Sequence, residues 1–169
     1  MNARSTTESS QTKRRMSLER QSDRELVVTR MIDAPPRIVY EAWTNAELFR
    51  RWWVPESFGL ELVSCDLDVR VGGGYRLVFR HPAAPEPMAF YGTYLDVTPP
   101  LRLVWTNEEA GGVAQVTTVT FEEHAGQTRL VIVERYPSKE ALDEAISAQS
   151  INWNDETFTQ LDELLASAR

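Results

Sequence analysis

Glu134 and Tyr136 are the residues of this chain best placed for acid–base chemistry. By the two-residue period of a β-strand they share a face with Leu130 and Ile132. If that face borders an apolar cavity, desolvation would raise the pKa of the Glu134 carboxyl, which suits a general base or a polar anchor for a ligand. A carboxylate paired at the end of a sheet is the alternative. We therefore assign no catalytic residue and keep Glu134 and Tyr136 as candidates.

A second pair of carboxylates, Asp66 and Asp68, lies on one side of a predicted strand together with Arg70. Carboxylates at this spacing could exchange protons with a substrate. The interpretation we favour is a solvent-facing strand in which Arg70 pairs with one of the acids. The alternating residues would then face the interior, namely Leu67, Val69 and Val71.

The chain has few residues suited to metal, phosphate or nucleophilic chemistry. Its two histidines, His81 and His124, lie in predicted turns, and Cys65 is its single cysteine, so we expect no metal site and no cofactor. The glycines at 72–74 lack the Lys-Ser/Thr of a phosphate-binding loop and predict a tight hairpin. Cys65 on a strand is typical of a small buried apolar group.

Aromatic residues are the best candidates for the wall of a ligand-binding cavity, because they offer a large apolar area and, in Tyr and Trp, one polar group. Three of the five tryptophans fall between positions 43 and 53. Simple core packing is the alternative and accounts for about half of the set. The short helices that carry Trp52, Trp53 and Phe58 would cover the cavity mouth. The other candidates are Tyr75, Phe79, Phe90, Tyr94, Trp105 and Trp153.

These side chains must be positioned by an alternation of strands and turns. An alternating segment at 25–33 predicts the first strand, and Asp33 before two prolines indicates a helix start. Asn45 can cap a second short helix. Six further strands are predicted between turn-forming residues, at 60–71, 75–80, 89–97, 101–106, 114–122 and 128–136. Short connections favour antiparallel neighbours.

Ser138 predicts the start of one long helix that reaches about residue 167, with acidic residues in its first turns. At 100° per residue, one broad face holds Leu142, Ile146, Gln149, Trp153, Thr157, Leu161 and Leu164. The polar residues Gln149 and Thr157 bracket Trp153. Either this part of the helix is partly exposed, or it borders a ligand-sized space that needs a few polar groups.

The predicted architecture is α+β, with a curved seven-stranded antiparallel sheet wrapped around the long C-terminal helix and two short helices after strand one. Residues 25–169 form this domain. Residues 1–24 are polar, predict a disordered tail, and leave Met16 as a possible natural start. The net charge of −7 disfavours binding to nucleic acid. No apolar run in the sequence is long enough to span a membrane. Because the sequence has a single cysteine and no secretory signal, we expect the protein to be located in the cytoplasm.

The chain resembles the START-like, or SRPBCC, superfamily. Within it, the chain is similar to bacterial domains related to the C-terminal domain of the heat-shock protein 90 ATPase activator. The motifs that carry the resemblance are IDAP (32–35), AWT (42–44), RWWVP (51–55), DLDVRVGG (66–73), FYGTY (90–94), PPLRLV (99–104), TVTF (118–121) and YPSKEALD (136–143). The resemblance implies a helix-grip fold with an apolar cavity under the last helix. Similar sequences often have glycines where this chain has residues 149–153, so ligand size does not carry over.

Three functions are compatible with these observations. The first is a non-catalytic domain that binds a small hydrophobic, aromatic or lipid-like ligand, with Gln149, Glu134 or Tyr136 orienting it. The second, implied by the resemblance, is a module that regulates the ATPase of a heat-shock chaperone. The third is a polyketide-cyclase-like enzyme that uses the same cavity. A monomer and a homodimer are both compatible with the sequence.

Overall fold

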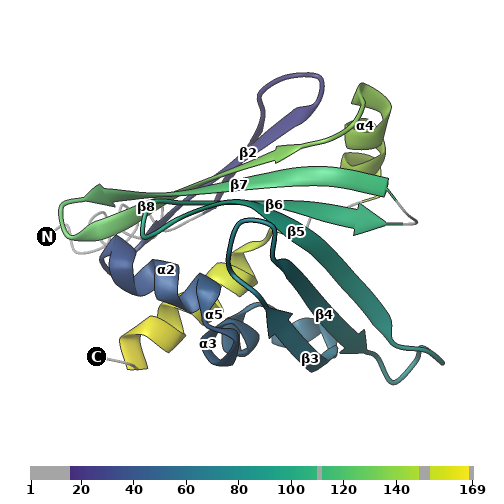
Figure 1. Cartoon of the computed structure of the whole chain (residues 1–169), viewed down its shortest axis with the longest axis horizontal. Helices are drawn as coiled ribbons and strands as arrows, with labels where there is room; N and C mark the ends of the chain where they lie inside the picture. The colour runs from purple at the N-terminus through teal and green to yellow at the C-terminus, as the bar shows by residue number, and fades with distance from the viewer. Residues whose placement is uncertain (1–15, 110–111, 149–152, 168–169) are drawn as a thin grey trace, which may run out of the picture.

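The computed structural model describes residues 16–109, 112–148 and 153–167. Its central element is one antiparallel sheet, in which the described strands lie in the order β1-β2-β8-β7-β6-β5-β4-β3 (Figure 1). The eight strands are β1 (Ser17–Arg20), β2 (Glu25–Ile32), β3 (Glu61–Leu67), β4 (Gly74–Arg80), β5 (Met88–Thr98), β6 (Arg102–Glu109), β7 (Gly112–His124) and β8 (Gln127–Arg135). The predicted α+β class with a curved antiparallel sheet is confirmed.

Three helices gather on one side of this sheet, and a fourth lies apart from them beyond the end of β8 (Figure 1). The helices are α2 (Pro36–Thr44), α3 (Ala46–Trp52), α4 (Lys139–Ser147) and α5 (Asp155–Ser167), with a short 3₁₀ turn η1 (Glu56–Phe58). The helix that lies apart is α4. None of the described helices has the length and apolar character that a membrane crossing requires.

Irregular pairing bends the sheet toward the helices. The register shifts between Leu62 and Ser64 in β3, between Tyr94 and Asp96 in β5, and again between residues 107 and 108 in β6. Such bulges increase local twist and bend a strand. As a result, β3 and β4 turn down beside α3 instead of continuing the plane of β7 and β8 (Figure 1).

The core lies between the inner face of the sheet and helices α2, α3 and α5. Trp43 of α2 and Phe121 of β7 meet edge to face with ring centroids 5.8 Å apart. Phe158 and Leu161 of α5 are fully buried in the same cluster. Burial of such side chains stabilises the fold by about 25 cal/mol per Å² of apolar surface. The aromatic residues of the short helices therefore serve the core as well as any cavity.

Two of the predicted helix caps are confirmed and one is wrong. The Asn45 side chain accepts hydrogen bonds from two backbone N–H groups of α3, and Ser138 accepts one from Ala141 at the start of α4. Asp33 is not the N-cap residue of α2, because Pro35 occupies that position and makes no side-chain hydrogen bond there. The fixed φ of the prolines suffices to start that helix.

The sheet has one more strand than the sequence predicts, because residues 17–20 pair with β2 although the polar composition indicates a tail. An edge strand is held by backbone hydrogen bonds and needs little apolar surface of its own. Arg20 further pairs with Asp143 of α4 at 2.6 Å. Residues 1–15 of the predicted tail lie outside the described residues.

The predicted continuous helix from Ser138 to residue 167 is wrong. α4 ends at Ser147 and α5 begins at Asp155. The Asn154 side chain accepts hydrogen bonds from the backbone N–H and the hydroxyl of Thr157, an N-cap arrangement that starts a new helix. The break separates α4, at the end of the sheet, from α5, which packs against α3.

The hairpin that follows β3 is a tight glycine turn, as predicted, with a φ of 85° at Gly72. Asp68 pairs with Arg70 at 3.0 Å, both exposed, as the favoured interpretation requires. Val71 is 64 % exposed and does not face the interior. The strand ends at Leu67, so the two-residue alternation no longer applies at position 71.

Candidate functional site

A cavity of about 680 Å³ lies inside the bend of the sheet. Its walls are the segment after α3, the inner faces of β3 to β7, and one side of α4. Eight of the predicted ligand-contacting residues line it: Trp53, Phe58, Tyr75, Phe79, Phe90, Tyr94, Trp105 and Tyr136. Their aromatic rings give the cavity a mainly apolar surface.

Four predicted residues do not line the cavity. Trp52 is fully buried and its indole N–H donates to the Ala42 carbonyl at 2.9 Å, since neighbouring residues on a helix point in different directions. Glu134 and Trp153 lie behind the wall and are hydrogen-bonded to each other, and Thr157 is buried in the first turn of α5. Gln149 lies outside the described residues.

The cavity also contains residues that the sequence analysis did not select. Trp43 and Phe49 contribute rings from α2 and α3, and Asn107, Gln115 and Asn154 add polar groups. The α4 wall consists of small residues, which are Ala141, Ala145 and Ala148. Their spacing of four and three residues marks one helix face, so this signal was present in the sequence.

Glu134 is the most unusual charged group beside the cavity, with 2 % of its surface exposed. Its carboxylate accepts hydrogen bonds from Thr117 Oγ1 at 2.7 Å, Trp153 Nε1 at 2.9 Å and Gln115 Nε2 at 2.5 Å. Burial raises its pKa from 4.5 to about 7, while the three hydrogen bonds favour the ionised form and act the other way. The carboxyl therefore changes charge near neutral pH.

A chain of hydrogen bonds extends this network along the cavity wall. The Tyr75 hydroxyl lies 2.8 Å from the Thr106 carbonyl oxygen and 3.0 Å from Asn107 Oδ1, so its one hydrogen is shared between these two acceptors, and Asn107 Nδ2 donates to Thr117 Oγ1 at 2.9 Å. The Thr117 hydroxyl donates in turn to Glu134. The donors of Asn107 and Thr117 are both directed toward the carboxylate, so this part of the network stabilises negative charge at that position.

Tyr136 lines the cavity just after the end of β8. Burial, with the nearby Glu134 charge as the smaller cause, raises the pKa of its phenol to about 12. The phenol therefore stays protonated at neutral pH and can donate a hydrogen bond. Glu134 is separated from the cavity by Gln115, so a direct reaction with a ligand would require that side chain to move. A catalytic role for Glu134 and Tyr136 remains a prediction.

Helix α5 holds the aromatic rim of the cavity in place. Gln160 Nε2 donates to the carbonyls of Trp52 and Val54 at 2.9 and 2.8 Å, and its Oε1 accepts from the Glu56 backbone N–H at 3.0 Å. Glu156 accepts from the backbone N–H and the hydroxyl of Ser57. Polar bonds across about 100 residues of sequence thus fix the segment that carries Trp53.

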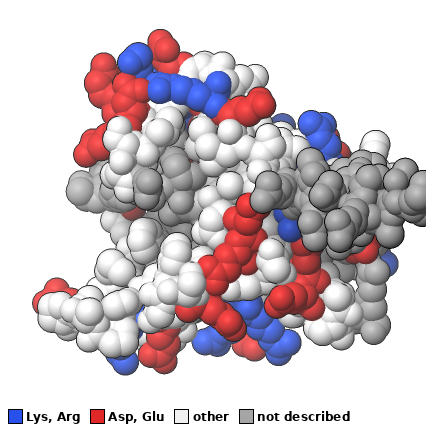
Figure 2. All heavy atoms as spheres, turned by 180° about the vertical axis from the view of Figure 1, so that it is seen from behind, with Lys and Arg blue, Asp and Glu red and all other residues white. Residues whose placement is uncertain are grey.

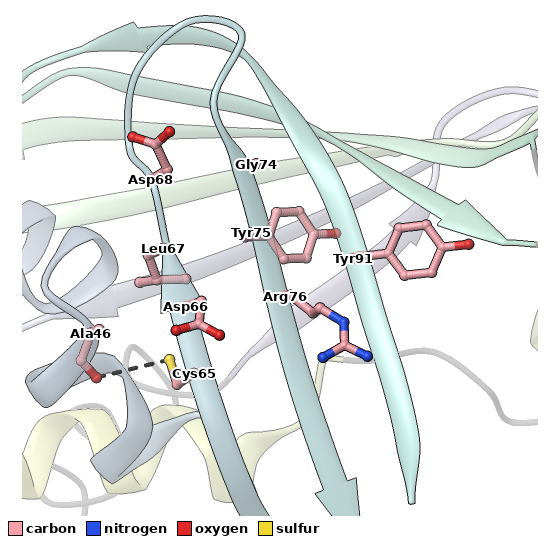
Figure 3. Close-up of a pocket in the computed structure, with 9 residues that line it drawn as sticks. All are labelled: Ala46, Cys65, Asp66, Leu67, Asp68, Gly74, Tyr75, Arg76 and Tyr91. Atoms are coloured by element: carbon pink, nitrogen blue, oxygen red, sulfur yellow. Dashed lines mark hydrogen bonds between the residues drawn. The ribbon is translucent and has the colours of Figure 1, made fainter.

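A second hollow, of about 760 Å³, opens broadly to solvent at the β3 edge of the sheet (Figure 3). Asp66, Arg76 and Tyr91 follow one another across β3, β4 and β5 there. The Cys65 thiol lies 3.9 Å from the Ala46 carbonyl, and burial raises its pKa to about 11. A thiol that stays protonated at neutral pH is a poor nucleophile.

Neither the charge pattern of the face drawn in Figure 2 nor the metal-ligating side chains of the described residues indicate a further site. Acidic and basic side chains intermingle over the face in Figure 2, without one broad basic area. Within the described ranges, no group of three or more His, Cys, Asp or Glu side chains could hold a metal ion. The candidate site is therefore the cavity inside the sheet.

Comparisons with known proteins identify the family and the fold of the chain. The model of the family described as "Activator of Hsp90 ATPase homolog 1-like protein" matches residues 33–166. No curated protein is similar enough in sequence to count as a match.

Several solved structures share the fold. A Rhodobacter sphaeroides protein aligns with a TM-score of 0.80 and 24 % identity, over 91 % of this chain and 99 % of its own. A Mycobacterium smegmatis protein aligns with a TM-score of 0.76 and 25 % identity, over 90 % of this chain and 98 % of its own. An AHSA1-like protein from Aeromonas hydrophila aligns with a TM-score of 0.62 and 18 % identity, over 82 % of this chain and 94 % of its own.

Proposed function

The chain belongs to the activator of Hsp90 ATPase homolog 1-like family, and from this membership and its cavity we propose that it is a non-catalytic binding domain for a small hydrophobic ligand. The single observation that supports the proposal most is the cavity of about 680 Å³ with its aromatic lining. This volume lies within the range of about 300–1,000 Å³ that is usual for small-molecule sites.

The lining suits a ligand with an aromatic or aliphatic body. Tyr75, Tyr94 and Trp105 form a set of edge-to-face rings with centroids 6.0 to 6.5 Å apart, which leaves ring faces and edges for a guest. Transfer of apolar ligand surface from water to this wall contributes about 25 cal/mol per Å². Asn107, Gln115 and Tyr136 offer the few polar contacts that fix orientation.

The test is binding of a neutral fluorescent probe, N-phenyl-1-naphthylamine, together with native mass spectrometry of gently purified protein. Ala141 lines the cavity on α4, whereas its neighbour Glu140 is exposed. Ala141→Phe should fill the space and weaken probe binding by more than about tenfold. Glu140→Phe adds the same ring on the outer side of the helix and should leave binding unchanged. Absence of probe binding, or equal binding by both variants, would overturn the proposal.

A second candidate function, regulation of a heat-shock chaperone ATPase, is favoured by the description of the matched family. The net charge of −7 would attract a basic surface on such a partner. The test is a pull-down and an ATPase assay with heat-shock protein 90 from the same host. Unchanged turnover at excess protein would count against this function without affecting ligand binding.

A further inference from the structure

The described polar groups around the cavity include a negative charge and no positive charge. Among the described residues that line it, Glu144 of α4 is a carboxylate, and none is Lys, Arg or His. Glu144 is exposed, at the rim. A ligand that enters the cavity therefore meets a carboxylate at the rim and mainly apolar rings inside.

The second carboxylate, Glu134, lies directly behind this lining. Gln115 forms part of the cavity wall and donates to Glu134 Oε2 at 2.5 Å, so one amide group separates the carboxylate from the cavity. Its partners among the described residues are three neutral donors, from Gln115, Thr117 and Trp153. None of the ion pairs in the described part of the chain includes Glu134.

A buried carboxylate without a cation is electrostatically uncompensated. Neutral hydrogen bonds spread its charge, but they do not cancel its field in a medium of low polarity. A cationic group in the cavity would interact favourably with both Glu134 and Glu144. A carboxylate ligand would be repelled by both, would lose its hydration, and would find no cationic side chain in the described lining.

The Gln115 amide can transmit this preference. One of its N–H groups is directed to Glu134, and its carbonyl oxygen accepts no hydrogen bond from the described residues. A carbonyl oxygen is an acceptor only, so it suits an ammonium or another donor. Tyr136 and Asn107 lie in the same lining and can complete the contacts of such a head group.

We propose that the cavity takes hydrophobic amines, meaning ligands with an aromatic or aliphatic body and one cationic nitrogen, and rejects fatty-acid-like carboxylates. This inference rests on the proposed binding function, which it extends by assigning the charge of the ligand. The apolar wall supplies affinity for the body, and the Gln115–Glu134 pair with Glu144 selects the head group.

The experiment measures displacement of N-phenyl-1-naphthylamine by three ligands of one body, 4-phenylbutylamine, 4-phenylbutanol and 4-phenylbutyrate, at about pH 8. The amine should bind at least about tenfold more tightly than the carboxylate. Equal affinities, or tighter binding of the carboxylate, would overturn the inference while leaving hydrophobic binding established. Failure of the neutral probe and of all three ligands to bind would instead refute the proposed function, and the inference with it.

Two variants locate the selectivity. Glu134→Gln should reduce the amine-to-carboxylate ratio at least about fivefold and change the affinity for the alcohol less than about twofold. Because that buried site could affect folding, Glu144→Lys provides a second test on an exposed residue, and it should shift the ratio toward the carboxylate. Ratios that stay unchanged in both variants would show that these carboxylates do not select the ligand.

Discussion

Replacement of Glu134 by Gln should remove a large part of the pH dependence of stability between about pH 5 and pH 8. The pKa of this buried carboxyl rises from 4.5 to about 7 on folding, so the folded chain holds a proton that the unfolded chain releases. The stabilisation by this group is fully present below pH 4.5. It is lost as the pH rises through about 7.

The magnitude follows from the two pKa values. At about 1.4 kcal/mol for each tenfold change in proton affinity, the ionised carboxyl costs the fold about 3 kcal/mol near pH 8 compared with the protonated form near pH 4.5. The glutamine side chain introduced by Glu134→Gln has nearly the same shape without the charge. The variant should therefore lack this decline in stability with rising pH. Its new amide NH₂ group must face donors of the network where a carboxylate oxygen accepted from them, which is a cost that does not depend on pH.

Urea unfolding at a series of pH values measures the effect through the midpoint and the slope. The difference in unfolding free energy between wild type and Glu134→Gln should change by about 3 kcal/mol from acid to alkaline pH, in favour of the variant at high pH. Glu144→Gln is the control, because it removes an exposed carboxylate at the cavity rim and keeps Glu134. Parallel curves for wild type and Glu134→Gln would refute the reasoning.

Three further predictions concern packing. A methyl group at Gly92 would lie 1.8 Å from a backbone carbonyl oxygen of β6, so Gly92→Ala should lower the free energy of unfolding by more than about 3 kcal/mol, measured by thermal or urea unfolding. The control is Gly112→Ala, where the added methyl group meets open space and should change stability by less than about 1 kcal/mol. Similar losses of stability in the two variants would contradict the close approach at Gly92. Gln160→Ala removes three hydrogen bonds to the cavity rim and should cost about 2 kcal/mol, with amide hydrogen exchange accelerated first in residues 52–58. Uniform acceleration along the chain would disagree. Trp43 is 2 % exposed, so Trp43→Leu should lower the free energy of unfolding by about 3 kcal/mol. Trp53 is only partly buried, at the cavity, so Trp53→Leu should lower it by clearly less. The reverse order of the two losses, measured by calorimetry, would argue against the core described here.

The order of elements could be predicted because local signals in the sequence are strong and agree. Alternation and glycine or proline turns mark seven strands, and Asn45 and Ser138 mark two helix starts through their capping side chains. Strand β1 could not be predicted in this way. Its residues pair through backbone groups, which leave no hydrophobic pattern to read.

The errors at the candidate site have two physical origins. Helical periodicity continues smoothly from 138 to 167, and only the capping sequence Asn154-Asp155-Glu156-Thr157 signals the new helix. Once the helix is broken, α4 and not α5 supplies the second wall of the cavity. Whether an aromatic ring faces the cavity or the core depends on packing between distant elements, and sequence alone does not specify it.

All five tryptophans of the chain belong to one cluster. Trp43 lies at its centre, with ring centroids 4.9 to 6.1 Å from those of Trp52, Trp53, Trp105 and Trp153. Indoles at such separations exchange excitation energy and couple their electronic transitions. The tryptophan emission of the protein therefore arises from this cluster, of which Trp43, Trp53 and Trp105 line the cavity. A guest molecule that touches Trp53 or Trp105 should alter the signal of the whole set, so the protein carries an optical reporter of its own occupancy.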